Sequence, residues 1–448
     1  MESEKPIPEG WGSVPLNQLV SPSKEKVEPA DDPDAFYIGL EHIEPNTTRI
    51  IGHGFARDTK STKTRFFSGS ILYGKLRPYL NKVSIPDFDG VCSTDILVFP
   101  PIDAVDTCYL MRFLSTSAVV DFATHQSSGM ELPRTNYQKL GQLQVPLPPI
   151  AEQRRIVARL EALLADVERV RGRLEAVAAT MQRFRQAVLA AAFSGDLTAE
   201  LRRTLGDDIE TNPWVMSTIS TVGLVSGGLT KNRKRSGYDT HLPYLRVANV
   251  YADRLDLSDV EEIGVDANEL PRILLKKGDL LIVEGNGSLE QIGRVALWNG
   301  EIEPCVHQNH IIKIRFSDAT DRRFALYWLL SPAGRQAITD VATSTSGLHT
   351  LSISKVENLP IPLPPLPEQH EIVRRVDALF ALADRIEGEV AGACERVEAL
   401  TQAVLAKAFR GELVPTEAEL ARREGREYEP AGVLLERVQA EQGRPRCR

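Results

Sequence analysis

The chain has 448 residues, a formal net charge of -8 at pH 7 and a hydrophobic fraction of 42%, values that fit an ordinary globular protein with two or three domains. It has no run of 18 apolar residues, and its first residues lack a basic segment followed by an apolar one, so we expect neither a membrane span nor a secretory signal. The five cysteines are scattered without a CxxC pair, which argues against a disulfide framework or a zinc ribbon. We therefore expect a cytoplasmic protein.

The first third of the chain alternates apolar runs with polar turns. The runs FYIGL (36–40), SILYGKL (70–76) and DILVFP (95–100) predict strands, and residues 109–123 predict one short amphipathic helix. Residues 1–145 hold 14 basic and 18 acidic side chains, so this segment has no basic surplus. These features indicate a small domain that contains both α-helix and β-strand.

A long helix is predicted next. Residues 146–197 begin PLPPIAEQRRIVARLEALL and end QAVLAAAFSGDL, and between these ends apolar residues recur at alternating steps of four and three. That spacing predicts a sustained heptad seam. We expect the helix to start after the Pro-Pro pair, where an acidic residue suits the helix dipole, and to stop at Gly195. About forty residues at about 1.5 Å each make a rod of roughly 60 Å.

The same plan then repeats. Residues 212–361, with 16 basic and 17 acidic side chains, contain the strand-like runs PYLRVANV, GDLLIVEG, RVALW and HIIKIRF and a helix around residues 324–330. Residues 362–413 repeat the long helix, and each position of 146–197 meets its partner 216 residues later without a gap. Because a heptad seam needs another helix to cover it, we expect the two long helices to form an antiparallel coiled coil. The predicted fold is an α+β tandem duplication with pseudo-two-fold symmetry.

Several motifs together resemble the specificity subunit of type I restriction-modification systems. They are PLPP-x-x-EQ at Pro146 and Pro362, the helix ends AF-x-G-[DE]-L, TAEL at 198–201 and EPAGVLLERV at 429–438. The resemblance covers essentially the whole chain. It implies two target recognition domains, residues 1–148 and 206–361, a central helical spacer at 149–205, and a C-terminal helical spacer and tail at 362–448.

The resemblance also implies the function and the partners. Each globular domain would read one half of a gapped, asymmetric sequence in double-stranded DNA, and the helices would set the spacing. The helices would dock two modification subunits, which are adenine-N6 methyltransferases using S-adenosylmethionine. The assembly can recruit a restriction and translocation subunit that uses ATP and Mg. This chain itself would be non-catalytic and would bind no cofactor or metal.

Candidate DNA contacts are basic, amide, hydroxyl and aromatic side chains that suit phosphates or base edges. In the first domain they are Lys60, Lys63, Arg65, Lys75, Arg77 and Tyr79. In the second they are the cluster Lys231, Arg233, Lys234 and Arg235, followed by Arg246, Asn249, Asn286, Ser288, Gln308 and Asn309. The alternative for each is a solvated turn residue. Candidate docking residues are those matched at both helix ends, namely Glu152, Gln153, Phe193, Glu368, Gln369 and Phe409.

Three weaker patterns point to catalysis or metal binding. Residues 69–75 match most of a phosphate-binding loop, but Leu76 stands where a metal-binding Ser or Thr is needed. Asp34, Asp58 and Lys60 loosely imitate a nuclease site, and a solvated polar loop is the simpler interpretation. Cys305, His307 and His310 could bind a metal, but strand alternation would put His310 on the opposite face, so we favour packing or DNA contact.

Two alternative functions therefore stay open beside DNA recognition. The first is a coiled-coil scaffold or anti-restriction decoy that binds the methyltransferase without reading DNA. The second is a self-contained enzyme, which the sequence argues against because it has no Asn-Pro-Pro-Tyr motif and no Gly-x-Ser-x-Gly elbow.

Overall fold

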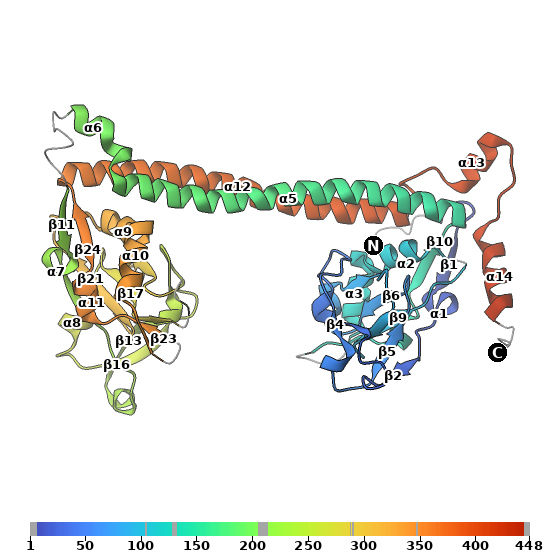
Figure 1. Ribbon diagram of the computed structural model, residues 1–448, viewed down its shortest axis with the longest axis horizontal. Coiled ribbons are helices and arrows are strands. Elements are labelled where there is room, and N and C mark those ends of the chain that lie inside the picture. Colours follow the sequence, from blue (N-terminus) through green and yellow to red (C-terminus); the bar gives the residue numbers. More distant parts are fainter. Residues whose placement is uncertain are drawn as a thin grey trace. The chain divides into compact units, whose positions relative to one another are not determined.

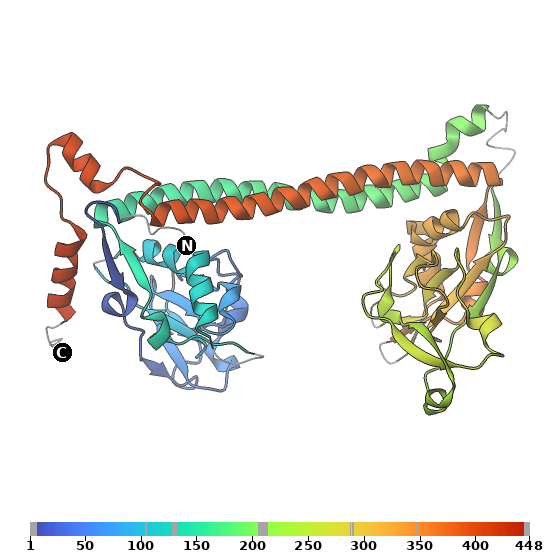
Figure 2. The ribbon, with the colours of Figure 1, turned by 180° about the vertical axis from the view of Figure 1, so that it is seen from behind.

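The two predicted long helices are present in the computed structural model, which describes residues 7–103, 105–127, 132–204, 214–286, 288, 291–345 and 348–442. Helix α5 spans Ile150–Ser194 and helix α12 spans Leu366–Phe409 (Figures 1 and 2). Each begins just after its Pro-Pro pair. Just beyond their ends lie Gly195 with φ 87° and Gly411 with φ 73°, in the left-handed conformation that glycine adopts most easily. The sequence therefore predicted both helix boundaries correctly.

The chain divides into two compact units, residues 1–174 with 392–448, and residues 175–391. The division cuts through both long helices, so each unit holds one globular domain and one part of each helix. In the first unit Arg171 of α5 donates to Glu398 of α12 over 3.0 Å. In the second unit Arg185 of α5 donates to Glu387 of α12 over 2.9 Å. The earlier residue of α5 thus meets the later residue of α12, and the helices pack antiparallel, as predicted.

The first unit contains a small domain with three separate sheets. The sheets have the strand orders β1-β10, β2-β5-β8-β3-β4 and β7-β6-β9. Their strands are β1 Gly12–Pro15, β2 Lys26–Val27, β3 Phe36–Ile38, β4 Gly54–Phe55, β5 Lys63–Phe66, β6 Ile71–Gly74, β7 Val83–Ser84, β8 Gly90–Cys92, β9 Ile96–Phe99 and β10 Gln144–Leu147. The helices are α1 Leu16–Leu19, α2 Thr107–Leu114, α3 Ser117–His125 and α4 Tyr137–Leu140, and the C-terminal tail adds α13 Glu417–Glu424 and α14 Ala431–Gln442.

The single helix predicted over residues 109–123 is wrong, because two helices occupy this stretch. The break falls at Ser115 and Thr116. The carbonyl of Ser115 accepts a hydrogen bond from Asn81 Nδ2 over 2.8 Å, so a side chain outside the helix takes the place of a helical partner. The hydroxyl of Thr116 bonds back to the carbonyl of Phe113 over 2.8 Å, a local bond that competes with helix continuation.

The second unit repeats this architecture with longer strands. Its main sheets have the orders β12-β21-β17-β19 and β16-β13-β20, beside the smaller sheets β11-β24, β14-β15 and β18-β23-β22. The strands are β11 Val215–Thr218, β12 Gly223–Gly227, β13 Thr240–Leu245, β14 Val250–Tyr251, β15 Arg254–Leu255, β16 Glu261–Val265, β17 Leu280–Val283, β18 Gly285–Asn286, β19 Val295–Leu297, β20 Val306–His307, β21 Ile311–Phe316, β22 Thr343–Thr345, β23 Leu348–Thr350 and β24 Pro360–Leu363. The helices are α6 Ala199–Thr204, α7 Ile219–Val222, α8 Leu270–Ile273, α9 Arg322–Leu330, α10 Pro332–Val341 and α11 Ile353–Glu357.

The long helices contribute to the core of each unit. In the first unit Ile156 and Leu160 are fully buried in the same apolar cluster as Tyr109 and Leu110 of α2. In the second unit a cluster joins α5 and α12 to α9, whose Phe324 is fully buried. Each globular domain is therefore packed on its own part of the helix pair. Within the described residues, no helix is both long and apolar enough to cross a membrane.

Candidate nucleic-acid interface

Equivalent loops follow the strands of the two globular domains. Strands β3 and β8 pair in parallel in the first domain, and β13 and β20 do so in the second. The central strand of the neighbouring sheet, β6 or β17, lies between two antiparallel partners. The loops after β3, β6 and β8 therefore correspond to the loops after β13, β17 and β20. Several of the predicted DNA contacts lie on these loops.

The turn after β6 carries three of the candidates of the first domain. Arg77 and Tyr79 are exposed, and Lys75 is half-buried. Arg77 has a left-handed backbone with φ 50°, which is uncommon for a residue other than glycine. The turn thus presents a guanidinium and a phenol on the surface, where they can reach a ligand. Their contact with DNA stays a prediction.

The basic run before and within β5 is more dispersed than its sequence suggests. Lys60 is exposed, but Lys63 is buried, and its Nζ donates to the carbonyl of Ser61 over 2.6 Å. Burial lowers the pKa of Lys63. Arg65 pairs with Glu25 at 3.2 Å and with Asp32 at 3.1 Å. Within the protein, Lys63 and Arg65 are therefore already bonded to other groups, and Lys60 is the most exposed member of the run.

The basic cluster of the second domain also contains both exposed cations and a buried cation that is paired within the protein. Arg233 and Lys234 are exposed. Arg235 is buried, and its guanidinium donates to both carboxylate oxygens of Glu269 over 2.9 and 3.0 Å. These bonds raise the pKa of Arg235. The geometry gives Arg235 a role in holding its loop, and leaves Arg233 and Lys234 as the accessible cations.

Lys231 and Arg246 are brought together by a shared carboxylate. Lys231 Nζ lies 2.6 Å from Glu261, and Arg246 Nη1 lies 2.7 Å from the same side chain. Arg246 also pairs with Asp259 over 2.7 Å. Asn249 is buried and caps the turn after β13, because its Oδ1 accepts from the backbone N–H of Arg246 over 2.8 Å. Asn249 therefore shapes the loop from inside.

The remaining polar candidates of the second domain lie after β17 and β20. Gln308 accepts a hydrogen bond from the backbone N–H of Val247 over 3.2 Å, and Asn309 is half-buried beside exposed His310. Ser288 is exposed, and the side chain of Asn286 lies outside the described residues. His310, for which the sequence favoured packing or DNA contact over metal binding, is exposed, and its Nδ1 lies 2.8 Å from Glu284 on the adjoining loop.

The predicted docking residues at the start of α5 are engaged within the chain. Glu152 is fully buried, and its carboxylate accepts from Trp11 Nε1 over 2.8 Å and from the backbone N–H of Glu417 over 2.7 Å. Burial raises the pKa of Glu152, and the two hydrogen bonds oppose that rise. We call Trp11, Glu152 and Glu417 the first helix-start cluster. It joins the N-terminal strand, the start of α5 and the tail after α12.

The start of α12 carries a second helix-start cluster of the same design. The carboxylate of Glu368 accepts from Thr198 Oγ1 over 2.7 Å, from Arg202 Nε over 2.6 Å and from Trp214 Nε1 over 3.2 Å. Here the residues that follow α5 fold back onto the start of α12. Thr198 and Glu368 are buried, and the side chain of Arg202 is 13% exposed.

The glutamines beside these carboxylates make matched bonds in both units. Gln153 Oε1 accepts from the backbone N–H of Asp106 over 2.8 Å, and Gln369 Oε1 accepts from that of Asp321 over 2.9 Å. These aspartates cap the starts of α2 and α9. The glutamines therefore join each long helix to its own globular domain. Their predicted role in docking a partner is separate from this geometry and stays a prediction.

Phe193 and Phe409 also contact the globular domains. The ring of Phe193 lies 5.2 Å from that of Phe324 and 5.3 Å from that of Trp328. The ring of Phe409 lies 5.2 Å from that of Tyr109 and 5.3 Å from that of Phe113. Both contacts have the tilted or edge-on geometry that aromatic pairs prefer. These phenylalanines thus stabilise the packing of each helix end on its domain.

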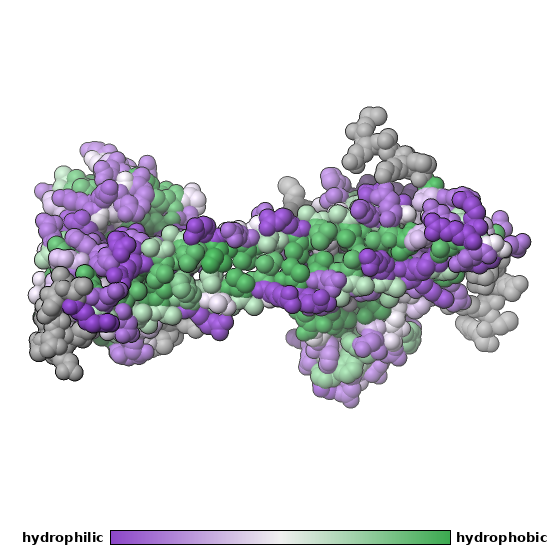
Figure 3. Space-filling view, turned by 90° about the horizontal axis from the view of Figure 1, so that it is seen from above, coloured by the Kyte–Doolittle hydropathy of each residue, from purple (hydrophilic) through white to green (hydrophobic). Residues whose placement is uncertain are grey.

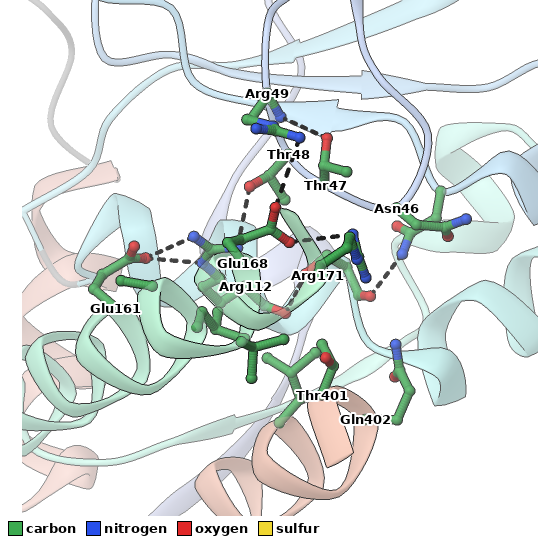
Figure 4. A pocket seen from close by; sticks show the side chains of 16 residues that line it. Asn46, Thr47, Thr48, Arg49, Arg112, Glu161, Glu168, Arg171, Thr401 and Gln402 are labelled. Carbon is green, nitrogen blue, oxygen red and sulfur yellow. Dashed lines mark hydrogen bonds and ion pairs between the residues drawn. The ribbon is translucent and has the colours of Figure 1, made fainter. Parts of the chain in front are cut away.

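A polar pocket of about 210 Å³ lies between the first domain and its parts of the long helices (Figure 4). Arg112 pairs with Glu161 of α5 over 2.8 Å, and Arg171 bonds to both Glu168 and Glu398.

In the second unit Arg323 pairs with Asp377 of α12 over 2.7 Å. Since Glu161 and Asp377 are 216 residues apart, both domains use the same helix position for an ion pair.

The possible metal ligands of the second domain do not converge. Cys305 and His307 are buried, whereas His310 is exposed. Burial lowers the pKa of His307 to about 3, and the nearby Lys313 adds to this effect. Among the described residues, no three Cys, His, Asp or Glu side chains are arranged to hold a metal ion. His307 therefore fills the core as a neutral imidazole.

The hydrogen-bond partners of Glu152 and Glu368 in the helix-start clusters were not predicted from the sequence. The signal was present, since Thr-Ala-Glu-Leu at 198–201 and Thr-Glu-Ala-Glu-Leu at 416–420 follow the two long helices. The repetition of this motif could have indicated a matched contact. The tryptophans before β1 and β11 also stand at equivalent positions, but nothing in the sequence shows that they bond to Glu152 and Glu368.

The chain matches one protein family twice, over residues 8–178 and 212–391, and that family is described as the type I restriction modification DNA specificity domain. A curated relative, the type I restriction enzyme EcoKI specificity subunit of Escherichia coli K12, is 33% identical over 73% of this chain and 68% of its own length. The StySPI specificity subunit of Salmonella potsdam is 33% identical over 68% of this chain and 65% of its own length. The chain thus spans about two thirds of the length of these relatives.

A solved structure gives a similar fold. Its description is "Structural basis underlying complex assembly and conformational transition of the type I R-M system", and one of its chains aligns with a TM-score of 0.69 at 23% identity. The alignment covers 91% of this chain and 100% of that chain. At this level of identity the likeness shows a shared fold.

Proposed function

The chain belongs to the type I restriction-modification DNA specificity family, and we propose that it recognises the target sequence of such a system as its non-catalytic subunit. Each globular domain reads one half of a gapped DNA site. The curated relatives are named as specificity subunits, which favours this function over a scaffold or decoy that does not read DNA. The duplicated domain, matched by the family twice, is the observation that carries the proposal.

The duplication explains why the two halves of the site would differ. Both domains share the parallel strand pair and the loops after it, but the side chains on these loops are different. After β6 the first domain presents Arg77 and Tyr79, whereas the equivalent loop after β17 in the second domain presents Ser288. Because base edges are distinguished by hydrogen-bond pattern, equivalent loops with different side chains select different bases. The result is an asymmetric target.

The charge of the chain places a condition on DNA binding. The formal net charge is -8, and several candidate cations are paired with carboxylates inside the protein. Phosphate neutralisation by this chain then depends on exposed cations such as Lys60, Arg233 and Lys234. The methyltransferase subunits of the assembly would supply the rest.

The long helices offer a surface for those subunits. Val170 and Leu400 on the helices of the first unit are 43% and 53% exposed, and Leu382 in the second unit is 39% exposed. Apolar residues follow the long helices in the space-filling view (Figure 3). A contiguous apolar patch that is exposed on a surface commonly marks a protein interface. We propose that the two methyltransferase subunits bind this surface of the long helices. The methyltransferase subunits would bind S-adenosylmethionine, and any restriction subunit would bind ATP and Mg.

The test is reconstitution with the cognate methyltransferase. The chain and the methyltransferase would be produced together, and N6-methyladenine mapped on a DNA library with and without this chain. We expect methylation at one two-part motif only when this chain is present. Methyltransferase binding without sequence-dependent methylation would support the decoy instead, and methylation by this chain alone would overturn the non-catalytic assignment.

A further inference from the structure

Arg134, which no sequence motif marks as a DNA contact, lies beside the turn after β6 in the first domain. Arg134 forms an antiparallel bridge with Leu76. On either side, the backbone N–H of Thr135 donates to the carbonyl of Lys75 over 3.1 Å, and that of Arg77 donates to the carbonyl of Pro133 over 2.8 Å. The backbone therefore joins Arg134 to the turn that carries Arg77 and Tyr79.

The guanidinium of Arg134 is oriented by Asp95. Its Nε donates to Asp95 Oδ1 over 3.2 Å, and its Nη2 donates to Oδ2 over 3.4 Å. Asp95 is itself tied to the turn, because its carbonyl accepts from the backbone N–H of Lys75 over 2.7 Å. The side chain of Arg134 is 52% exposed and that of Asp95 is 27% exposed. The carboxylate thus uses one edge of the guanidinium and leaves the other edge, formed by Nη1 and the second hydrogen of Nη2, available.

We propose that Arg134 reads a guanine in the half-site recognised by the first domain. Two parallel N–H donors on the available edge match O6 and N7 of guanine, the commonest specific arginine contact in the major groove. Pairing with Asp95 fixes the plane of the guanidinium before DNA arrives, so less side-chain entropy is lost on binding. This inference rests on the proposed function and names the base chemistry of one position.

The second domain supports a recognition role for this position. The carbonyl of Glu284 accepts from Leu351 N–H over 2.7 Å, as that of Lys75 accepts from Thr135. The N–H of Glu284 donates to the carbonyl of His310 over 2.9 Å, as that of Lys75 donates to Asp95. Gly285 pairs with Thr350 as Leu76 pairs with Arg134, so a threonine stands at the place of Arg134. His310 stands at the place of Asp95 and bonds to Glu284 over 2.8 Å. The backbone arrangement is kept while the side-chain chemistry changes, as a position that reads different bases requires.

The proposal is tested with the reconstituted complex and a library randomised at every target position. For Arg134→Ala we expect one position of one half-site to lose its requirement for guanine, with discrimination falling roughly 10- to 100-fold, the range that one bidentate contact supplies. The other half-site should be unchanged. Arg134→Lys keeps the charge and should lose most of the discrimination, because an ammonium group cannot make the bidentate contact; it also serves if the alanine variant fails to fold.

Arg57→Ala is the matched control, since Arg57 lies in the same domain, is 50% exposed and pairs with Asp34. It should leave the motif unchanged. If both Arg134 variants fold and keep the full guanine requirement, the inference is overturned. A uniform loss of methylation with an unchanged motif would show a phosphate contact and would also overturn it. If the wild-type complex shows no sequence-dependent methylation, the proposed function itself has failed.

Discussion

Replacing Glu368 with alanine tests whether the second helix-start cluster holds the unit together. The carboxylate is 8% exposed as a side chain and accepts three hydrogen bonds, one of them from the guanidinium of Arg202. Glu368→Ala would remove the carboxylate that accepts the hydrogen bonds of Thr198, Arg202 and Trp214. Removing one partner of a buried ion pair costs about 3–5 kcal/mol, a large fraction of the roughly 5–15 kcal/mol that stabilises a typical domain.

The measurement is urea unfolding of the full chain, followed by tryptophan fluorescence and circular dichroism. We expect the transition of the second unit to move to lower urea, because α6 and the start of α12 lose their shared contact. Glu368→Gln keeps one carbonyl oxygen as acceptor and should lose less stability.

Glu389→Ala is the matched control, since Glu389 is an exposed residue of the same helix. Its effect should stay within about 0.5 kcal/mol, as for most surface substitutions. If Glu368→Ala destabilises the unit by less than about 1 kcal/mol, the cluster does not hold α12 in place and the reasoning from its burial is refuted.

Three further predictions follow from particular side chains. Phe409→Ala should lower the free energy of unfolding of the first unit by about 2–4 kcal/mol because it removes ring contacts with two buried aromatics; an unchanged unfolding midpoint would contradict this. His307 has a pKa of about 3 in the folded protein, so the unfolded chain binds its proton first and stability should fall by up to about 1.4 kcal/mol per pH unit as pH drops from about 6.5 towards 3. His307→Gln should flatten that slope, and equal slopes in urea titrations of the two proteins would refute the assignment. Arg233→Ala should weaken DNA binding by the complex at all sequences and reduce the slope of log K against log salt by about 1, whereas an altered motif would contradict a phosphate contact.

The long helices could be predicted from the sequence because their signals are local. A heptad seam, a Pro-Pro start and a terminal glycine recur in both copies, and each has a direct physical meaning for a helix. The antiparallel pairing also follows, since each seam needs a cover. Strands β3 and β21 lie within the predicted runs 36–40 and 310–316, and could be found because these apolar runs are short and bounded by polar turns.

The environment of polar side chains could not be predicted in this way. Arg235 belongs to a polar run that suggests an exposed loop, yet it is buried because its partner Glu269 lies 34 residues away. Asn249 belongs to a run that predicts a strand, yet it is buried in the turn after β13, where it accepts from the backbone N–H of Arg246. The break between α2 and α3 has a similar cause, since Asn81 supplies the competing donor. Such contacts depend on the tertiary fold and leave no periodic pattern in the sequence.

The sequence selected only some of the side chains that make up the candidate DNA interface. The turn with Arg77 and Tyr79 was selected because it places a cation and an aromatic ring close together in the sequence. Arg134 and Asp95 are 39 residues apart and meet only through the bridge to the β6 turn. Only the folded structure shows that these two side chains form a pair.

The most direct test of the central claim is a domain exchange. Residues 206–361 would be replaced by the corresponding segment of a family member that has a different target, and N6-methyladenine would be mapped in the reconstituted complex. If each domain reads one half-site, one half of the motif changes to that of the donor and the other half stays the same. A motif that stays whole, or that changes in both halves, would contradict the assignment of one half-site to each domain.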